Sequence, residues 1–209
     1  MTTLKVISDV VCPWCYIGKH RLDQALALLP EHNIEVQWLP FELNPNLPID
    51  GMPREDYCVR KFGSLENAQR IYGNVAAHAN ADGLAINLEK IAITPNTKRA
   101  HRLIWYASQQ QLGDAVVDNL FGAYFVNGED ISNIECLAKL GAAAGLEEAQ
   151  VNSFLHSDRG TQETRVLTEA SYDSGVQGVP AFMWGDLWLF AGAQSPETIA
   201  LVLEKQLEK

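Results

Sequence analysis

The ten residues DVVCPWCYIG, from Asp9 to Gly18, contain two cysteines three positions apart in a chain of 209 residues. The β-branched residues that precede them, within 4–10, predict a short strand. Pro13 suits the first position of a helix, where its missing N–H is not needed. Cys12 therefore lies at a strand-to-helix junction, where unpaired N–H groups and the helix dipole favour thiolate over thiol. Cys15 lies one turn deeper and is placed to attack Cys12 within a mixed disulfide.

A metal site and a pair of buried thiols are the two other interpretations of these cysteines. A zinc site needs two further ligands, and Cys-x-x-Cys pairs in such sites usually come in twos. The remaining cysteines, Cys58 and Cys136, are widely separated single residues, so we expect no metal. Two inert thiols would not need a proline suited to a helix start between them. Redox chemistry is the favoured interpretation.

The periodicity of the whole chain predicts an α/β fold. Apolar spacing indicates a helix over residues 14–29 and a strand over residues 34–43, and this βαβ order implies parallel pairing. The chain beyond this strand has a helical rhythm up to about residue 176, with four or five helices and no convincing strand. Two strands then flank the turn Gly185-Asp186, and Ser195 caps a last helix. The expected order is βαβ, helical insertion, ββα.

Charge and hydropathy exclude several classes of partner. The net charge of −10, from 16 Lys plus Arg and 26 Asp plus Glu, repels a phosphate backbone, and no basic patch opposes it. No apolar stretch approaches the roughly 20 residues of a membrane span, and no signal peptide is visible. We therefore expect no nucleic acid or membrane partner and a cytoplasmic location, where the four cysteines would form no structural disulfides.

Val179-Pro180 lies directly before the first strand of the C-terminal hairpin. An X-Pro bond at this position can be cis, which exposes the preceding carbonyl and N–H groups to an extended partner. An ordinary proline of an edge strand is the alternative. The cysteine pair at the other end of the chain favours the first interpretation.

Four segments together resemble the DsbA-family thiol-disulfide oxidoreductases of the FrnE type, within the thioredoxin superfamily. They are DVVCPWCYIG, PFELNP (40–45), NTKRAHRL (96–103) and GVQGVPAF (175–182). The resemblance implies a thioredoxin-like fold, residues 1–48 and 177–209, interrupted by an all-helical insertion domain, residues 49–176. It also implies a cis peptide at Val179-Pro180 facing the cysteines, with Cys12 as the attacking thiol and Cys15 as the resolving one.

Relatives that use glutathione leave a second function open. The 2-hydroxychromene-2-carboxylate isomerases and kappa-class glutathione transferases share the helical insertion and resemble the NTKRAHRL segment, but usually carry Ser where this chain has Cys12. The cysteine favours disulfide exchange with a protein or small-molecule substrate. Glutathione as reductant or ligand stays open, with Val179, Pro180, Asn96 and His101 as its candidate contacts, and no tightly bound cofactor is expected. A chaperone-like polypeptide binder using an apolar groove around Trp14 is the alternative that is not an enzyme.

Several other residues are candidates for supporting roles. Asp9 and Glu42 lie at or just past the ends of two adjacent parallel strands, where α/β sites form, and either could shuttle the proton of Cys15. Hydrogen bonding to a loop is the alternative for each. His101 could cover the site or be a structural histidine. Trp14, if exposed, offers an apolar face to a peptide.

Overall fold

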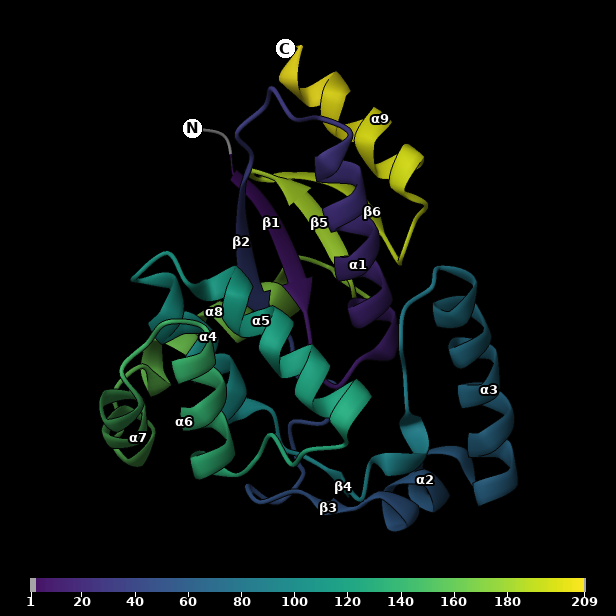
Figure 1. The fold of residues 1–209 in the computed structure, drawn as a ribbon, viewed down its shortest axis with the longest axis vertical. Coiled ribbons are helices and arrows are strands. Elements are labelled where there is room, and N and C mark those ends of the chain that lie inside the picture. Colours follow the sequence, from purple (N-terminus) through teal and green to yellow (C-terminus); the bar gives the residue numbers. More distant parts are fainter. Residues whose placement is uncertain (1–2, 209) are drawn as a thin grey trace.

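The computed structural model describes residues 3–208 and builds them around a four-stranded sheet (Figure 1). The sheet has the order β2-β1-β5-β6, with the strands β1 (Thr3–Ser8), β2 (Glu35–Pro40), β5 (Ala181–Trp184) and β6 (Leu187–Ala191). Strand β1 pairs parallel with β2 and antiparallel with β5, while β5 and β6 form an antiparallel hairpin. The predicted βαβ and ββα units therefore combine into one sheet.

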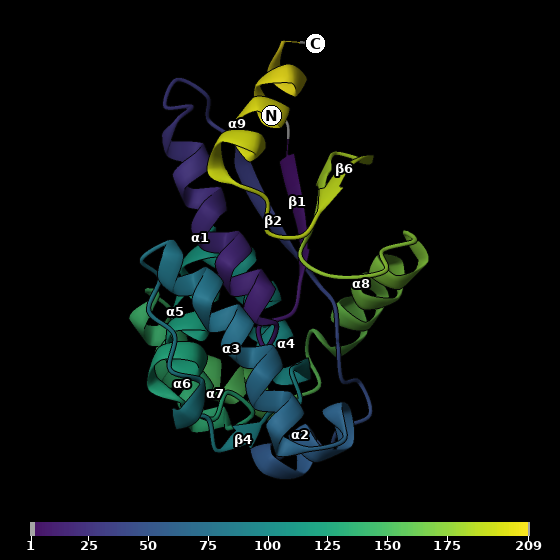
Figure 2. The same ribbon diagram turned by 90° about the vertical axis from the view of Figure 1, so that its right-hand side faces the viewer.

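Helices cover the sheet on both sides. Helices α1 (Pro13–Ala27) and α9 (Pro196–Leu207) lie on one face, and α8 (Thr161–Asp173) lies on the other (Figure 2). Ser195 caps α9 as predicted, because its hydroxyl accepts a hydrogen bond from the Thr198 N–H at 3.3 Å. No helix within residues 3–208 combines the length and apolar character needed to cross a bilayer.

The segment between β2 and β5 is a helical insertion. Its helices are α2 (Arg54–Phe62), α3 (Leu65–Ala81), α4 (Lys98–Ser108), α5 (Gly113–Gly122), α6 (Ile134–Ala143), α7 (Glu148–His156) and α8, with short helical turns at Leu88–Lys90 and Ala123–Asn127. The described residues thus hold seven α-helices there, where the periodicity predicted four or five. Tight turns such as the one at Gly63, with a φ of +83°, divide runs that apolar spacing alone joins.

A two-stranded ladder corrects the expectation that the insertion is purely helical. Strands β3 (Met52–Pro53) and β4 (Ile93–Thr94) pair antiparallel beside α2. Two residues are too few for an alternating pattern to be recognised in a sequence, which is why the ladder was not predicted.

A buried lysine of α1 pairs with carboxylates of the insertion. The Lys19 ammonium is 4% exposed and lies 2.9 Å from an Asp118 carboxylate oxygen and 3.4 Å from one of Asp114, both on α5. Burial alone would lower the pKa of Lys19, but these carboxylates and that of Asp23 outweigh it and raise the pKa. The proposed division into residues 1–48 plus 177–209 and residues 49–176 stays a prediction, since one hydrophobic cluster extends across both parts.

Candidate functional site

The two cysteines lie at the start of α1, immediately beyond the carboxyl end of β1. The Cys12 N–H donates to the Asp9 carbonyl at 2.9 Å, which closes a tight turn before the helix. Pro13 occupies the first helical position, and no side chain caps the helix at Cys12. The first N–H groups of α1 are therefore left without a side-chain acceptor at the end of the helix where Cys12 lies. Both cysteines are free thiols, 6% and 1% exposed for Cys12 and Cys15 respectively.

Cys15 holds its proton. Burial raises its pKa well above the usual value, and a hydrogen bond and charge repulsion from Cys12 raise it further. The Ser8 hydroxyl and the Asp9 backbone act in the opposite direction but do not outweigh burial. A protonated Cys15 can donate a hydrogen bond to the Cys12 sulfur.

The peptide bond between Val179 and Pro180 is cis, and it lies against the cysteines. The Cys12 sulfur lies 3.6 Å from the Val179 carbonyl oxygen. Helix α1 approaches this loop at Gly18, where an added Cβ would lie 2.8 Å from the Pro180 Cγ atom. Gly18 was not singled out from the sequence, although a glycine inside a helical pattern is a signal of close packing.

A groove of about 690 Å³ lies beside this loop. Trp14, Val179 and Trp188 line it together with Gln177 and small residues, and none of its lining residues is charged. Trp188 on β6 is 44% exposed and was not a candidate from the sequence. Trp14 also contacts the His78 ring of α3, with ring centroids 5.2 Å apart. The surface next to Cys12 is therefore uncharged and partly aromatic.

Asp9 and His101 meet behind the cysteines. The Asp9 side chain is fully buried, and its Oδ2 atom accepts a hydrogen bond from the Leu43 N–H at 2.7 Å. Its Oδ1 atom lies 3.4 Å from Nε2 of His101. The same Nε2 lies 3.1 Å from the Phe41 carbonyl oxygen, which can only accept, so this nitrogen carries a proton. Helix α4 thus brings a histidine to the edge of the sheet where β1 ends.

Glu42 lies next to this pair. Burial raises the pKa of its carboxyl group, while the charges of His101 and Lys98 lower it in part. The Lys98 ammonium lies 3.9 Å from a Glu42 carboxylate oxygen. Asp9 raises the Glu42 pKa further, so the two carboxyl groups influence each other at the ends of neighbouring strands.

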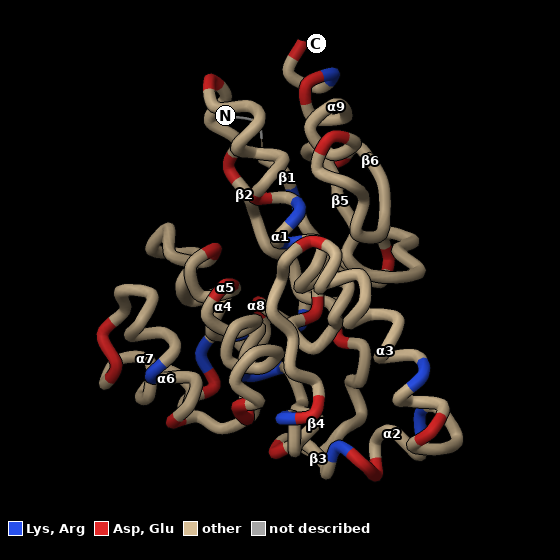
Figure 3. Tube along the Cα trace, turned by 45° about the vertical axis from the view of Figure 1, so that its right-hand side comes forward, with Lys and Arg blue, Asp and Glu red and all other residues tan. Residues whose placement is uncertain are grey.

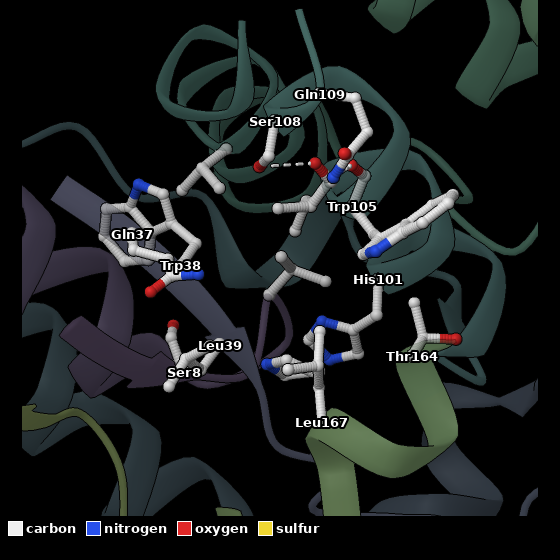
Figure 4. A pocket seen from close by; sticks show the side chains of 14 residues that line it. Ser8, Gln37, Trp38, Leu39, His101, Trp105, Ser108, Gln109, Thr164 and Leu167 are labelled. Carbon is white, nitrogen blue, oxygen red and sulfur yellow. Dashed lines mark hydrogen bonds between the residues drawn. The ribbon is translucent and has the colours of Figure 1, made fainter. Parts of the chain in front are cut away.

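Asn96 and His101 lie apart from the groove at Trp14. The Asn96 amide donates to the Leu47 carbonyl at 2.8 Å, and its oxygen accepts from the Lys98 N–H at 3.0 Å, so its side chain joins a loop to the start of α4. His101 lines a separate cavity of about 230 Å³. Figure 4 shows that cavity between Gln37 and Trp38 of β2 on one side and Trp105 of α4 with Gln109, just after that helix, on the other. Neither residue is among those that line the groove at Trp14.

The two remaining cysteines are apart from the pair. Cys58 is buried on α2, and burial is the main cause of its raised pKa. Cys136 on α6 donates a hydrogen bond to Glu129, with the sulfur 3.5 Å from Oε2. Within residues 3–208 no group of three or more His, Cys, Asp or Glu side chains is arranged to hold a metal ion.

Comparisons with known proteins agree with this architecture. The crystal structure of a probable DsbA oxidoreductase from Streptomyces coelicolor, SCO1869, has a TM-score of 0.89 and 29% identity, covering 100% of this chain and 91% of that one. A 2-hydroxychromene-2-carboxylate isomerase structure has a TM-score of 0.71 and 16% identity, covering 99% and 94%. The cytosolic disulfide reductase DsbM from Pseudomonas aeruginosa, solved with GSH, has a TM-score of 0.65 and 18% identity, covering 99% and 100%.

The predicted thioredoxin-like fold and the resemblance to the DsbA family are both confirmed. The model of the DSBA-like thioredoxin domain matches residues 3–204, which is nearly the whole chain. This chain belongs to the family of DSBA-like thioredoxin domains.

Proposed function

We propose that this protein is a dithiol-disulfide oxidoreductase that works through Cys12 and Cys15. The observation that carries the proposal is the asymmetry of the pair: Cys12 lies at the uncapped start of α1, and the buried Cys15 keeps its proton. Membership of a family of thiol oxidoreductases supports it. An attacking thiolate and a protonated resolving thiol are the two roles that disulfide exchange requires.

The exchange proceeds in two steps. The Cys12 thiolate attacks one sulfur of a substrate disulfide, the substrate S–S bond breaks, and the other substrate sulfur leaves as a thiolate. Cys15 then gives up its proton and attacks the Cys12 sulfur, so that a Cys12–Cys15 disulfide forms, the mixed disulfide breaks and the second substrate sulfur leaves as a thiolate. The substrate gains two electrons and the cysteine pair loses two. In the reverse direction the oxidised pair accepts two electrons from a substrate dithiol.

Neighbouring groups have separate roles in this proposal. Asp9 is the buried carboxylate that takes the Cys15 proton in the second step, because it lies between the end of β1 and the turn that leads into the cysteines. The carbonyl of Val179 and the ring of Pro180 align an extended substrate beside Cys12, and Pro13 and Trp14 shape the same face. Glu42 and His101 set the charge around Asp9 rather than touching the reacting sulfurs.

Glutathione is the proposed reductant that returns the pair to the dithiol form. The structural similarity to DsbM, a cytosolic disulfide reductase solved with GSH, favours it and a cytoplasmic location. The similarity to the 2-hydroxychromene-2-carboxylate isomerase suggests glutathione-dependent isomerisation as a second candidate. Cys12 favours disulfide exchange, because a cysteine can form the mixed disulfide on which exchange depends.

Reduction of a cystine peptide by the purified protein, coupled to glutathione, tests the proposal. Cys12→Ser should abolish turnover, and Cys15→Ser should accumulate a mixed disulfide detectable by mass spectrometry. Cys58→Ser and Cys136→Ser serve as matched controls and should leave turnover unchanged. Retained turnover in the Cys12→Ser protein would overturn the proposal. Glutathione-dependent turnover of 2-hydroxychromene-2-carboxylate by that variant would point to the isomerase instead.

A further inference from the structure

Arg54, the first residue of α2, carries a largely buried charge without an anionic partner. Its guanidinium carbon lies 4.5 Å from the centre of the Tyr72 ring and 5.5 Å from that of Tyr57. It donates a hydrogen bond of 3.3 Å to the Thr94 hydroxyl, and a second hydrogen bond joins its side chain to that of Tyr72. None of the ion pairs found among residues 3–208 includes Arg54. The aromatic rings stabilise the cation but do not neutralise it.

Other arginines of this protein are satisfied in a different way. Arg21 makes two contacts to the Asp82 carboxylate, at 2.6 and 3.2 Å. Arg99 pairs with Asp50 at 2.7 Å. Arg102 has no carboxylate partner, but it donates five hydrogen bonds to backbone carbonyls. A guanidinium group has five N–H donors, so Arg54 still has N–H groups that can donate to a planar anion.

The Arg54 side chain lines a groove between α2 and α3. The groove has a volume of about 790 Å³ and is lined by Arg54 and Tyr72, with an apolar wall formed mainly by Leu65, Ala68, Leu88 and Ile91. Small-molecule sites commonly span about 300–1,000 Å³ and combine an apolar lining with a few polar groups. Neither Cys12 nor Val179 lines it, so this groove is separate from the proposed redox site.

The charges at the groove limit which anion it would accept. Glu55, Asp56 and Glu89 also line it and are exposed, and acidic and basic segments lie side by side along α2 (Figure 3). These carboxylates repel a multiply charged anion such as phosphate. A single negative charge can approach Arg54 while solvent screens the exposed carboxylates.

We propose that the groove between α2 and α3 binds a small amphipathic monocarboxylate. Its carboxylate pairs with the Arg54 guanidinium, which presents a fork of N–H donors of matching geometry. Its apolar chain lies along the wall formed by Leu65, Ala68, Leu88 and Ile91. Binding removes apolar surface from water and gives a mostly buried cation its counter-charge.

Titration calorimetry with octanoate tests this site, with 1-octanol as the uncharged probe. Octanoate should bind the full-length protein in the sub-millimolar range. Arg54→Gln should weaken octanoate binding by about tenfold or more and leave octanol binding unchanged, because only the charged pair is lost. Arg60→Gln is the matched control, since Arg60 is an exposed arginine on the same helix that does not line the groove. Inorganic phosphate should not displace octanoate.

A second pair of variants keeps the test decisive if Arg54→Gln impairs folding. Ala76→Phe should fill the groove and abolish binding of both probes, while Ala77→Phe, at the next and exposed position of α3, should not. The proposal is overturned if octanoate does not bind, if folded Arg54→Gln protein binds it as well as the parent does, or if Arg60→Gln weakens it equally. Equal effects of the two alanine variants, or displacement by phosphate, also overturn it.

Discussion

The Cys12 sulfur lies 3.6 Å from the carbonyl oxygen of Val179, although the two residues are 167 positions apart in the chain. Antiparallel pairing of β1 with β5 brings them together, because Ile7 is in register with Ala181, one residue beyond Pro180. The attacking thiol and the backbone proposed to align its substrate therefore come from opposite ends of the sequence. Any change that shifts α1 relative to the loop before β5 should affect both.

Gly18→Ala should destabilise the protein and slow disulfide exchange. The new methyl group would lie 2.8 Å from Pro180 Cγ, so helix or loop must move, at a cost of about 1–3 kcal/mol. Gly73→Ala is the control, since its added Cβ meets nothing within 4 Å, and a helix gains about 0.5–1 kcal/mol from this change. Urea unfolding gives the stability of each variant, and a disulfide-exchange assay gives its rate. Equal stability of both would contradict the packing described for Gly18.

Asp9→Asn should slow the second step of exchange and spare the first. The amide oxygen can still accept the Leu43 N–H, so the local structure is kept, but the carboxylate proposed to accept the Cys15 proton is lost. Loss of a general base typically costs about 10²–10⁴ in rate. Rapid-mixing measurements should show normal formation of the mixed disulfide, slow resolution, and a pH profile of resolution displaced upward. An unchanged profile would leave Asp9 with a structural role only.

Glu42→Gln should stabilise the protein at neutral pH. Burial raises the pKa of Glu42 in the folded state, so folding favours its protonated form. That contribution is fully present below the unfolded pKa of about 4.5 and is lost as pH rises through the higher folded pKa. The variant should therefore exceed the parent in free energy of unfolding at pH 7 and match it below about pH 4. Exposed Glu204→Gln is the control; a Glu42→Gln protein less stable than the parent at pH 7 would refute this.

Cys136 should resist alkylation despite its partial exposure. Burial and the hydrogen bond to Glu129 raise its pKa to about 12, so at pH 8 only about one molecule in ten thousand carries the thiolate. Peptide mapping after brief iodoacetamide treatment should find Cys12 labelled and Cys136 unlabelled. Glu129→Gln should accelerate labelling of Cys136, because it removes the negative charge that holds the proton. Labelling of Cys136 ahead of Cys12 would be the contrary result.

Local chemistry was enough to predict the elements that carry the cysteines. The predicted helix over 14–29 is α1, Pro13–Ala27, and the predicted strand over 34–43 is β2, Glu35–Pro40. The hairpin around Gly185 and Asp186 and the cap at Ser195 are also confirmed. Each depends on residues within a few positions of one another: a proline at a helix start, a capping hydroxyl, a two-residue turn.

The contacts between distant elements were decided by packing, which no local pattern encodes. Periodicity indicates that one face of a helix is buried but does not name the surface that covers it. The proximity of Gly18 to Pro180 and the contact of His101 with Asp9 each involve elements far apart in the chain. The amino-acid sequence alone therefore determined the strand-to-helix cysteine pair, since its geometry is local. The tertiary structure determined which groups surround that pair, because close-packed side chains from separate helices and strands meet only after the chain has folded.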